Sequence, residues 1–119
     1  MANILVIDDS KAIRDMMRAI LENNGHIVTV AEDGEEALGI AQKTGFNIIF
    51  SDINMPKMSG ITLIGKIKET EKNRYTPIVM VTTETAEYRK QKARVSGAAG
   101  WLMKPVSEER VLAAVKKLV

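Results

Sequence analysis

Five short apolar runs divide the chain, and polar or turn-forming residues bound each of them. The runs are rich in Ile, Val, Leu and Met and do not alternate between polar and apolar positions. Runs of this kind are typical of strands that are covered on both faces of a sheet. The predicted strands are Asn3–Ile7, His26–Ala31, Ile48–Asp52, Ile78–Val81 and Gly100–Met103.

An amphipathic helix is predicted after each strand, because apolar residues recur there at intervals of three and four. The third of these helices carries a polar tail over residues 68–76. The predicted N-caps are Ser10, Asp33, Ser59, Thr85 and Ser107, and the predicted terminating glycines are Gly25, Gly45 and Gly97. The apolar stripe of the last helix consists of Val111, Leu112, Val115, Leu118 and Val119.

The regular alternation of buried strand and amphipathic helix predicts an α/β fold, a doubly wound parallel sheet with helices on both faces. No linker, repeat or low-complexity segment interrupts the pattern. We therefore expect residues 1–119 to form a single domain without a separate output domain.

Polar side chains follow four of the five strands at their carboxyl ends. Asp8 and Asp9 follow the first, Asp52 the third, Thr82 the fourth and Lys104 the fifth. In open parallel sheets these ends meet at one edge, where functional groups collect. Three carboxylates, one hydroxyl and one ammonium are therefore expected to lie close together.

Carboxylates that converge in this way repel one another, so the site requires positive charge beyond that of Lys104. The chain has no cysteine, and its one histidine, His26, lies far from these positions in sequence, which disfavours zinc. Oxygen ligands of this type suit Mg²⁺. An acidic site with a metal, a lysine and a hydroxyl also suits a phosphoryl group on a carboxylate nucleophile, and Asp52 is the candidate.

The bulk composition narrows the classes of function. The net charge is only +2 and no nucleic-acid-binding motif is present, so we expect no nucleic-acid partner. The apolar start of the chain is too short for a signal peptide, and no segment reaches the length of a membrane span. We expect a cytoplasmic protein that does not contact membranes.

The chain resembles response-regulator receiver domains over its whole length, and most closely the stand-alone CheY-type receivers of chemotaxis. Each matching motif lies at a strand end, and all occur in the family's order. The motifs are Asp8-Asp9, Asp52 with Asn54, Met55, Pro56 and Gly60, Thr82, and Lys104-Pro105. The resemblance implies a flavodoxin-like (βα)5 fold with strand order 2-1-3-4-5.

For the site, the resemblance implies that Asp52 accepts a phosphoryl group from a sensor histidine kinase. One Mg²⁺ ion would be bound by Asp9, by Asp52 and by the main-chain carbonyl of Asn54, with Asp8 acting through a water molecule. Lys104 would pair with the phosphoryl group, and the Lys104–Pro105 peptide bond would be cis.

The resemblance also implies a two-state switch, in which Thr82 moves toward the phosphoryl group and Trp101 turns inward. The surface from the fourth helix to the fifth would then bind a target such as the flagellar motor switch protein. The implied protein is a monomeric signalling phosphoacceptor that catalyses only its own phosphorylation and dephosphorylation, and a phosphatase is a further candidate partner. Asn54 and Glu84 hold positions that tune the lifetime of the phosphorylated state.

Three residues depart from the family pattern. Trp101 replaces a more usual Tyr or Phe, Thr83 a small residue, and Val106 a frequent Phe. Thr83 and Trp101 are expected to crowd the switch. Val106 bears on kinase contact and on access to the pocket.

Alternatives remain at this point. Asp8 and Asp9 are also acceptable helix caps, Trp101 is as suitable for the core as for a switch, and the basic residues of the fourth helix suit either a solvated face or a binding patch. A stand-alone receiver can also act as a phosphate sink or relay. A phosphohydrolase of the haloacid dehalogenase kind is disfavoured, since its nucleophile follows the first strand. A flavin binder is disfavoured because Asp8 and Asp9 would repel the flavin phosphate.

Overall fold

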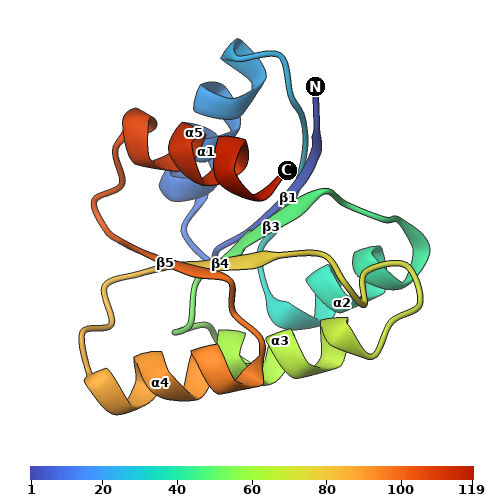
Figure 1. Ribbon diagram of the computed structural model, residues 1–119, viewed down its shortest axis with the longest axis vertical. Helices are drawn as coiled ribbons and strands as arrows, with labels where there is room; N and C mark the ends of the chain where they lie inside the picture. The colour runs from blue at the N-terminus through green and yellow to red at the C-terminus, as the bar shows by residue number, and fades with distance from the viewer.

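The computed structural model describes residues 1–119 and consists of five strands that alternate with five helices (Figure 1). The strands are β1 (Asn3–Ile7), β2 (Ile27–Ala31), β3 (Ile48–Ser51), β4 (Ile78–Thr82) and β5 (Gly100–Met103). The helices are α1 (Lys11–Asn23), α2 (Gly34–Lys43), α3 (Gly60–Lys68), α4 (Glu87–Ser96) and α5 (Glu108–Leu118). No helix is both long and apolar enough to cross a bilayer.

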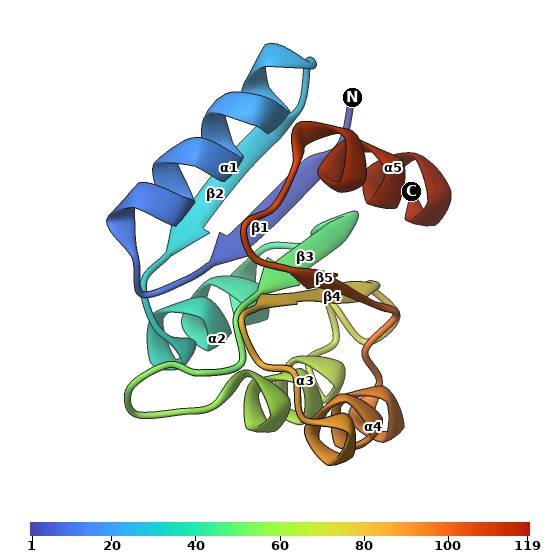
Figure 2. The same ribbon diagram turned by 90° about the vertical axis from the view of Figure 1, so that its left-hand side faces the viewer.

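All the strands pair in parallel in one sheet of order β2-β1-β3-β4-β5. Helices α1 and α5 cover one face, and α2, α3 and α4 cover the other (Figure 2). Each face has its own buried apolar cluster. The predicted α/β class, the flavodoxin-like strand order and the helices on both faces are therefore confirmed.

The strands are less uniformly buried than their sequence indicates. Every residue of β3 and β4 is buried, as predicted for central strands. The edge strands differ, because each has a neighbour on one side only: Ile27 at the start of β2 is 51% exposed, and β5 is only partly buried. The predicted start of the second strand at His26 and the inward position of Val119 are also wrong, since β2 begins at Ile27 and Val119 is exposed.

Four of the five predicted helix caps are confirmed. The side chains of Ser10, Asp33, Ser59 and Ser107 each accept a hydrogen bond from the backbone N–H three residues later. The prediction for Thr85 is wrong, because α4 begins one residue later and its N-cap, Ala86, has no side chain that can cap. The carboxylate of Glu84 accepts a hydrogen bond from the Ala86 N–H instead, at 3.0 Å.

The polar segment after α3 is mostly exposed, but its side chains Thr70, Asn73 and Thr76 are buried. Asn73 is fully buried, and its amide nitrogen donates to the carbonyl oxygens of Ala41 and Thr44 at 2.7 and 2.8 Å. Its side-chain oxygen accepts hydrogen bonds from the N–H of Phe46 and from the hydroxyl of Thr76. One side chain therefore joins the end of α2 to the segments just before β3 and β4. These contacts lie at the amino-terminal ends of the strands, opposite the acidic residues at the carboxyl ends.

Gly60, the first residue of α3, lies against the backbone that carries Asp52. A Cβ atom at this position would overlap the Asp52 carbonyl oxygen and would lie 2.9 Å from the Cα of Ile53. The Gly60 N–H also donates to the Ile53 carbonyl at 2.8 Å. The lack of a side chain at Gly60 thus lets α3 begin close to the end of β3.

We expect Gly60→Ala to lower the free energy of unfolding by on the order of 3 kcal/mol, because the backbone that a Cβ would meet cannot move aside cheaply. Gly39→Ala is the matched control, since Gly39 lies inside α2 and a methyl group added there would meet nothing within 4 Å. Gly39→Ala should stabilise by about 0.5–1 kcal/mol. Chemical denaturation measures both values, and an unchanged stability of Gly60→Ala would contradict the close approach.

Candidate functional site

The polar residues predicted to meet at one edge of the sheet do so. Asp8 and Asp9 follow β1, Asp52 follows β3, Thr82 ends β4 and Lys104 follows β5. Parallel pairing of β1 with β3 and of β4 with β5 brings these ends together. Asp8, Asp52 and Thr82 are buried, Lys104 is half-buried and Asp9 is exposed.

Lys104 bridges two of the three carboxylates. Its ammonium lies 2.8 Å from an oxygen of Asp52 and 2.8 Å from an oxygen of Asp8. The side chain of Lys104 is 14% exposed, and those of its two partners are less exposed still. Because these charges are largely removed from water, each depends on the others for compensation.

The two carboxylate oxygens of Asp52 have different partners. Oδ1 accepts hydrogen bonds from the backbone N–H groups of Ile53 and Asn54, at 2.7 and 3.3 Å. Oδ2 accepts the hydrogen bond from Lys104. This arrangement fixes the orientation of the carboxylate at the mouth of the sheet.

The pKa shifts at the site follow from burial and pairing. Burial raises the pKa of Asp8 above its ordinary value, and the hydrogen bonds from Lys104 and from the Ser10 N–H oppose that rise only in part. Burial tends to lower the pKa of Lys104, but the hydrogen bonds to Asp52 and Asp8 outweigh it, so that pKa is raised. Lys104 therefore stays protonated, and additional positive charge beside Asp8 would favour the ionised form of that carboxyl.

The acidic cluster fits a hard divalent cation. One carboxylate oxygen from each of Asp8, Asp9 and Asp52 lies within 4.8 Å of the others. The single ammonium of Lys104 leaves this group negative, and all three side chains offer the oxygen ligands that Mg²⁺ prefers. The exposed Asp9 lies on the solvent side of the cluster, where an ion would enter.

Thr82 and Lys104 are tied to each other and to the next loop. The Lys104 N–H donates to the Thr82 carbonyl at 3.0 Å, and the Lys104–Pro105 peptide bond is cis, as predicted. The Thr82 hydroxyl accepts a hydrogen bond from the Glu84 N–H at 3.1 Å. Thr83 is exposed, whereas Val106 packs against the apolar cluster beneath α1 and α5.

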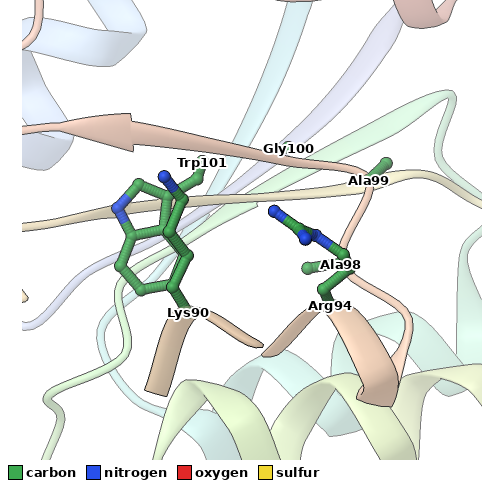
Figure 3. A pocket seen from close by; sticks show the side chains of 6 residues that line it. All are labelled: Lys90, Arg94, Ala98, Ala99, Gly100 and Trp101. Carbon is green, nitrogen blue, oxygen red and sulfur yellow. The ribbon is translucent and has the colours of Figure 1, made fainter. Parts of the chain in front are cut away.

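Trp101 lies on the outer side of β5, partly exposed (Figure 3). Its indole N–H donates to the sulfur of Met103 at 3.4 Å, and the Lys90 ammonium lies 5.9 Å from the ring centroid. Trp101 packs against the buried cluster under α4 but is not fully buried in the core. The aromatic ring is therefore available at the surface.

Two hollows flank β5 beside Trp101. One, of about 260 Å³, is lined by α4 and the loop before β5, and Arg94 and Lys90 extend over it from the helix (Figure 3). The other, of about 390 Å³, lies between β5 and α5 and is mostly apolar, with Arg110 and Lys117 among its lining residues. Both hollows are lined by basic side chains of a neighbouring helix together with Trp101.

The sequence did not predict two contacts at the site. The Arg14 guanidinium donates to the Asp8 carbonyl at 2.7 Å, and Arg89 lies 3.4 Å from the carboxylate of Glu84. Arg14 lies one turn into the first helix, shortly after the acids that end the first strand, and this position could have predicted its contact with Asp8. The spacing of five residues between Glu84 and Arg89 crosses the start of α4, so helical periodicity gave no signal for that pair.

The residues that match known proteins cover almost the whole chain. Residues 4–116 match the response regulator receiver domain. The chain belongs to this family. Chemotaxis protein CheY4 of Vibrio cholerae is 41% identical in sequence, with a TM-score of 0.95 and coverage of 100% of this chain and 99% of CheY4.

Two further relatives resemble this receiver domain. Protein PilG of Pseudomonas aeruginosa is 38% identical over 113 residues, which are 95% of this chain and 84% of PilG. A response regulator of Burkholderia pseudomallei is 30% identical with a TM-score of 0.88, over 97% of this chain and 66% of that one. Its crystal structure contains a phosphorylated aspartic acid, a calcium ion and citrate.

The raised pKa of Asp8 leads to a pH-dependent stability. Because the folded-state pKa exceeds that of the unfolded chain, the contribution of Asp8 is present below pH 3.8 and is lost as the pH rises through the raised pKa. Asp8→Asn removes this loss, so without metal the stability of the variant relative to the wild type should rise as the pH increases toward neutrality. Thermal unfolding in EDTA at several pH values measures the difference.

Asp15→Asn is the control for this prediction. Asp15 is an exposed acid on α1 whose pKa is lowered by its hydrogen bond with Lys11. Its contribution has the opposite sign, since it is present at neutral pH and lost as the pH falls. A difference between Asp8→Asn and wild type that stays constant with pH would contradict the assignment of Asp8 as the acid that burial disfavours in its charged form.

Proposed function

We propose that this receiver domain is a phosphorylation-activated switch of a chemotaxis-type two-component system, with Asp52 as the phosphoacceptor. The observation that carries the proposal is the pair of short contacts from Lys104 to the buried Asp52 and Asp8, beside a third carboxylate. If Asp52 had only a structural role, two further acids beside it would not be needed. Support also comes from the phosphorylated aspartic acid of the Burkholderia relative.

In the proposed reaction a carboxylate oxygen of Asp52 attacks the phosphorus of a phosphohistidine on a sensor kinase. The new O–P bond forms as the N–P bond breaks, and the histidine leaves with the electron pair and takes up a proton. The ammonium of Lys104 neutralises charge on the transferring group. Mg²⁺, held by Asp9, Asp52 and the Asn54 carbonyl with Asp8 through water, would supply further charge neutralisation.

The switch follows from the change in charge at Asp52. A phosphoryl group brings new acceptor oxygens and draws on Lys104, which in the unphosphorylated protein is shared with Asp8. The Thr82 hydroxyl would turn from its contact with the Glu84 N–H toward the phosphoryl group. Trp101 would then turn inward from its exposed position on β5, which changes the surface beside α4. Asn54 and Glu84 would set how readily water reaches the acyl phosphate.

The proposed output surface comprises α4, β5 and α5. Its partly exposed Trp101, the apolar hollow between β5 and α5 and the basic residues that line both hollows suit a protein segment with apolar and acidic side chains. The likeness to CheY4 favours a chemotaxis target such as the flagellar motor switch, in the cytoplasm and with the receiver as a monomer. The alternative is a receiver that acts as a phosphate sink or relay. In either case the chain is a phosphoacceptor that catalyses only its own phosphorylation and dephosphorylation.

Trp101 is the only tryptophan, so its fluorescence reports the switch directly. We expect acetyl phosphate to change the emission when Mg²⁺ is present, with the gain of one phosphoryl mass, and EDTA to abolish both effects. Asp52→Asn should lose both while it retains the fold. Phosphorylation without a change at Trp101 would contradict the switch, and the absence of phosphorylation would contradict the proposed function itself.

A further inference from the structure

Helix α4 has a second hollow, on the side that faces α3. Its volume is about 240 Å³, and it lies between two helices that run side by side beneath the sheet (Figure 2). It is separate from the hollow of Figure 3, which lies on the β5 side of the same helix. The lining residues are Ser59, Ile61, Thr62, Tyr88, Arg89 and Lys92.

The charge of this second hollow is not balanced within it. Arg89 and Lys92 are both cationic, and none of the lining residues is acidic. Lys92 makes no ion pair and no hydrogen bond, although α4 carries a glutamate at Glu87. The only carboxylate within 4 Å of either cation is that of Glu84, at 3.4 Å from Nε of Arg89.

The Arg89 side chain is 28% exposed, and its one charged partner is Glu84. Its Nε atom is buried from solvent and makes no hydrogen bond, because the approach to Glu84 does not have hydrogen-bond geometry. The partner of this buried atom is the carboxylate of Glu84, so a ligand in the hollow would be held by the other guanidinium N–H groups and by Lys92. The remaining guanidinium N–H groups of Arg89 make no hydrogen bond to protein atoms either.

The other lining residues suit a phosphate on an organic body. The hydroxyls of Ser59 and Thr62 lie 3.2 Å apart at the start of α3, beside the two cations. A phosphate offers more acceptor oxygens than a carboxylate, and its two negative charges match one guanidinium and one ammonium. The exposed ring of Tyr88 and the side chain of Ile61 provide apolar contact for the rest of the ligand.

We propose that the hollow between α3 and α4 is a binding site for a small organic phosphate, held by Arg89 and Lys92. Glu84 connects this site to the phosphoacceptor site, since its N–H donates to the Thr82 hydroxyl while its carboxylate lies against Arg89. A phosphate at Arg89 competes with Glu84 for the guanidinium. That connection rests on the role proposed for Thr82, whereas the binding site itself does not.

The test uses the full chain in EDTA without a phosphoryl donor, titrated with phenyl phosphate and, separately, with inorganic phosphate. Amide chemical shifts in NMR spectra report where each binds. We expect saturable shifts at Ser59, Thr62 and Arg89, with phenyl phosphate binding more tightly than inorganic phosphate. Lys92→Gln should weaken the binding of phenyl phosphate about tenfold, the scale of one charge-assisted hydrogen bond.

Arg94→Gln is the matched control, because Arg94 is a cation of the same helix that lines only the hollow on the β5 side. It should change the affinity less than about twofold. Glu84→Gln keeps an acceptor for the Ala86 N–H but frees Arg89 from a carboxylate, so it should raise the affinity about two- to fivefold.

Equal weakening by Lys92→Gln and Arg94→Gln would overturn the proposal, since it would show a diffuse attraction to the basic helix. Shifts that do not saturate, or that centre on Lys104, would also overturn it. The same titration on Asp52→Asn separates the two proposals. Binding of phenyl phosphate that persists in Asp52→Asn shows that the hollow binds independently of the phosphoacceptor site. If the wild type does not bind phenyl phosphate at the hollow, the binding proposal fails while the proposed function is unaffected.

Discussion

The ammonium of Lys104 lies between two buried carboxylates, and the arrangement of the whole acidic edge depends on this charge balance. Asp8 and Asp52 come from adjacent strands, and each would repel the other strongly in a site with so little water. The two 2.8 Å contacts of Lys104 compensate part of that repulsion, and the exposed Asp9 adds a third negative charge. The structure thus keeps an excess of negative charge where a cation and a phosphoryl group can relieve it. A site of this kind is stable enough to fold and responds to a change in charge.

The parallel sheet makes this concentration of charge possible. Each of the three strands that carry the charges is anchored by an apolar run, so the polar residues begin only where the strands end. Gly60 then allows α3 to start against the Asp52 carbonyl, which holds the loop after β3 close to the sheet. At the opposite edge, Asn73 joins α2, β3 and β4 by buried hydrogen bonds. The proposed switch places the movement away from these contacts, in the segment around Thr82, Glu84 and α4.

Most of the fold follows from local patterns in the sequence. Apolar runs and helical spacing indicate every strand and helix, and four of the five caps, because these signals depend on neighbours within a few positions. The acidic edge is also predictable, since parallel strands bring their carboxyl ends together whatever their order. The roles assigned to Asp52, Asp9 and Asn54 rest on family resemblance and stay predictions.

What the sequence does not indicate are contacts between distant segments and departures from local rules. Asn73 reaches acceptors about thirty residues earlier in the chain, and no periodic pattern marks such a residue. The N-cap of helix α4 is an alanine, and the Glu84 carboxylate accepts the hydrogen bond of its N–H in place of the predicted cap at Thr85. The same glutamate forms the ion pair with Arg89, so one side chain both caps α4 and holds a cation of that helix.

The most direct test of the central claim is to locate the phosphoryl group. After treatment with acetyl phosphate and Mg²⁺, borohydride reduces an aspartyl phosphate to homoserine, and peptide mass spectrometry identifies the modified position. We expect homoserine at position 52 alone, and none when Mg²⁺ is withheld. Homoserine at position 8 or 9, or none at all with metal and donor present, would contradict the claim that the buried, lysine-paired carboxylate is the nucleophile.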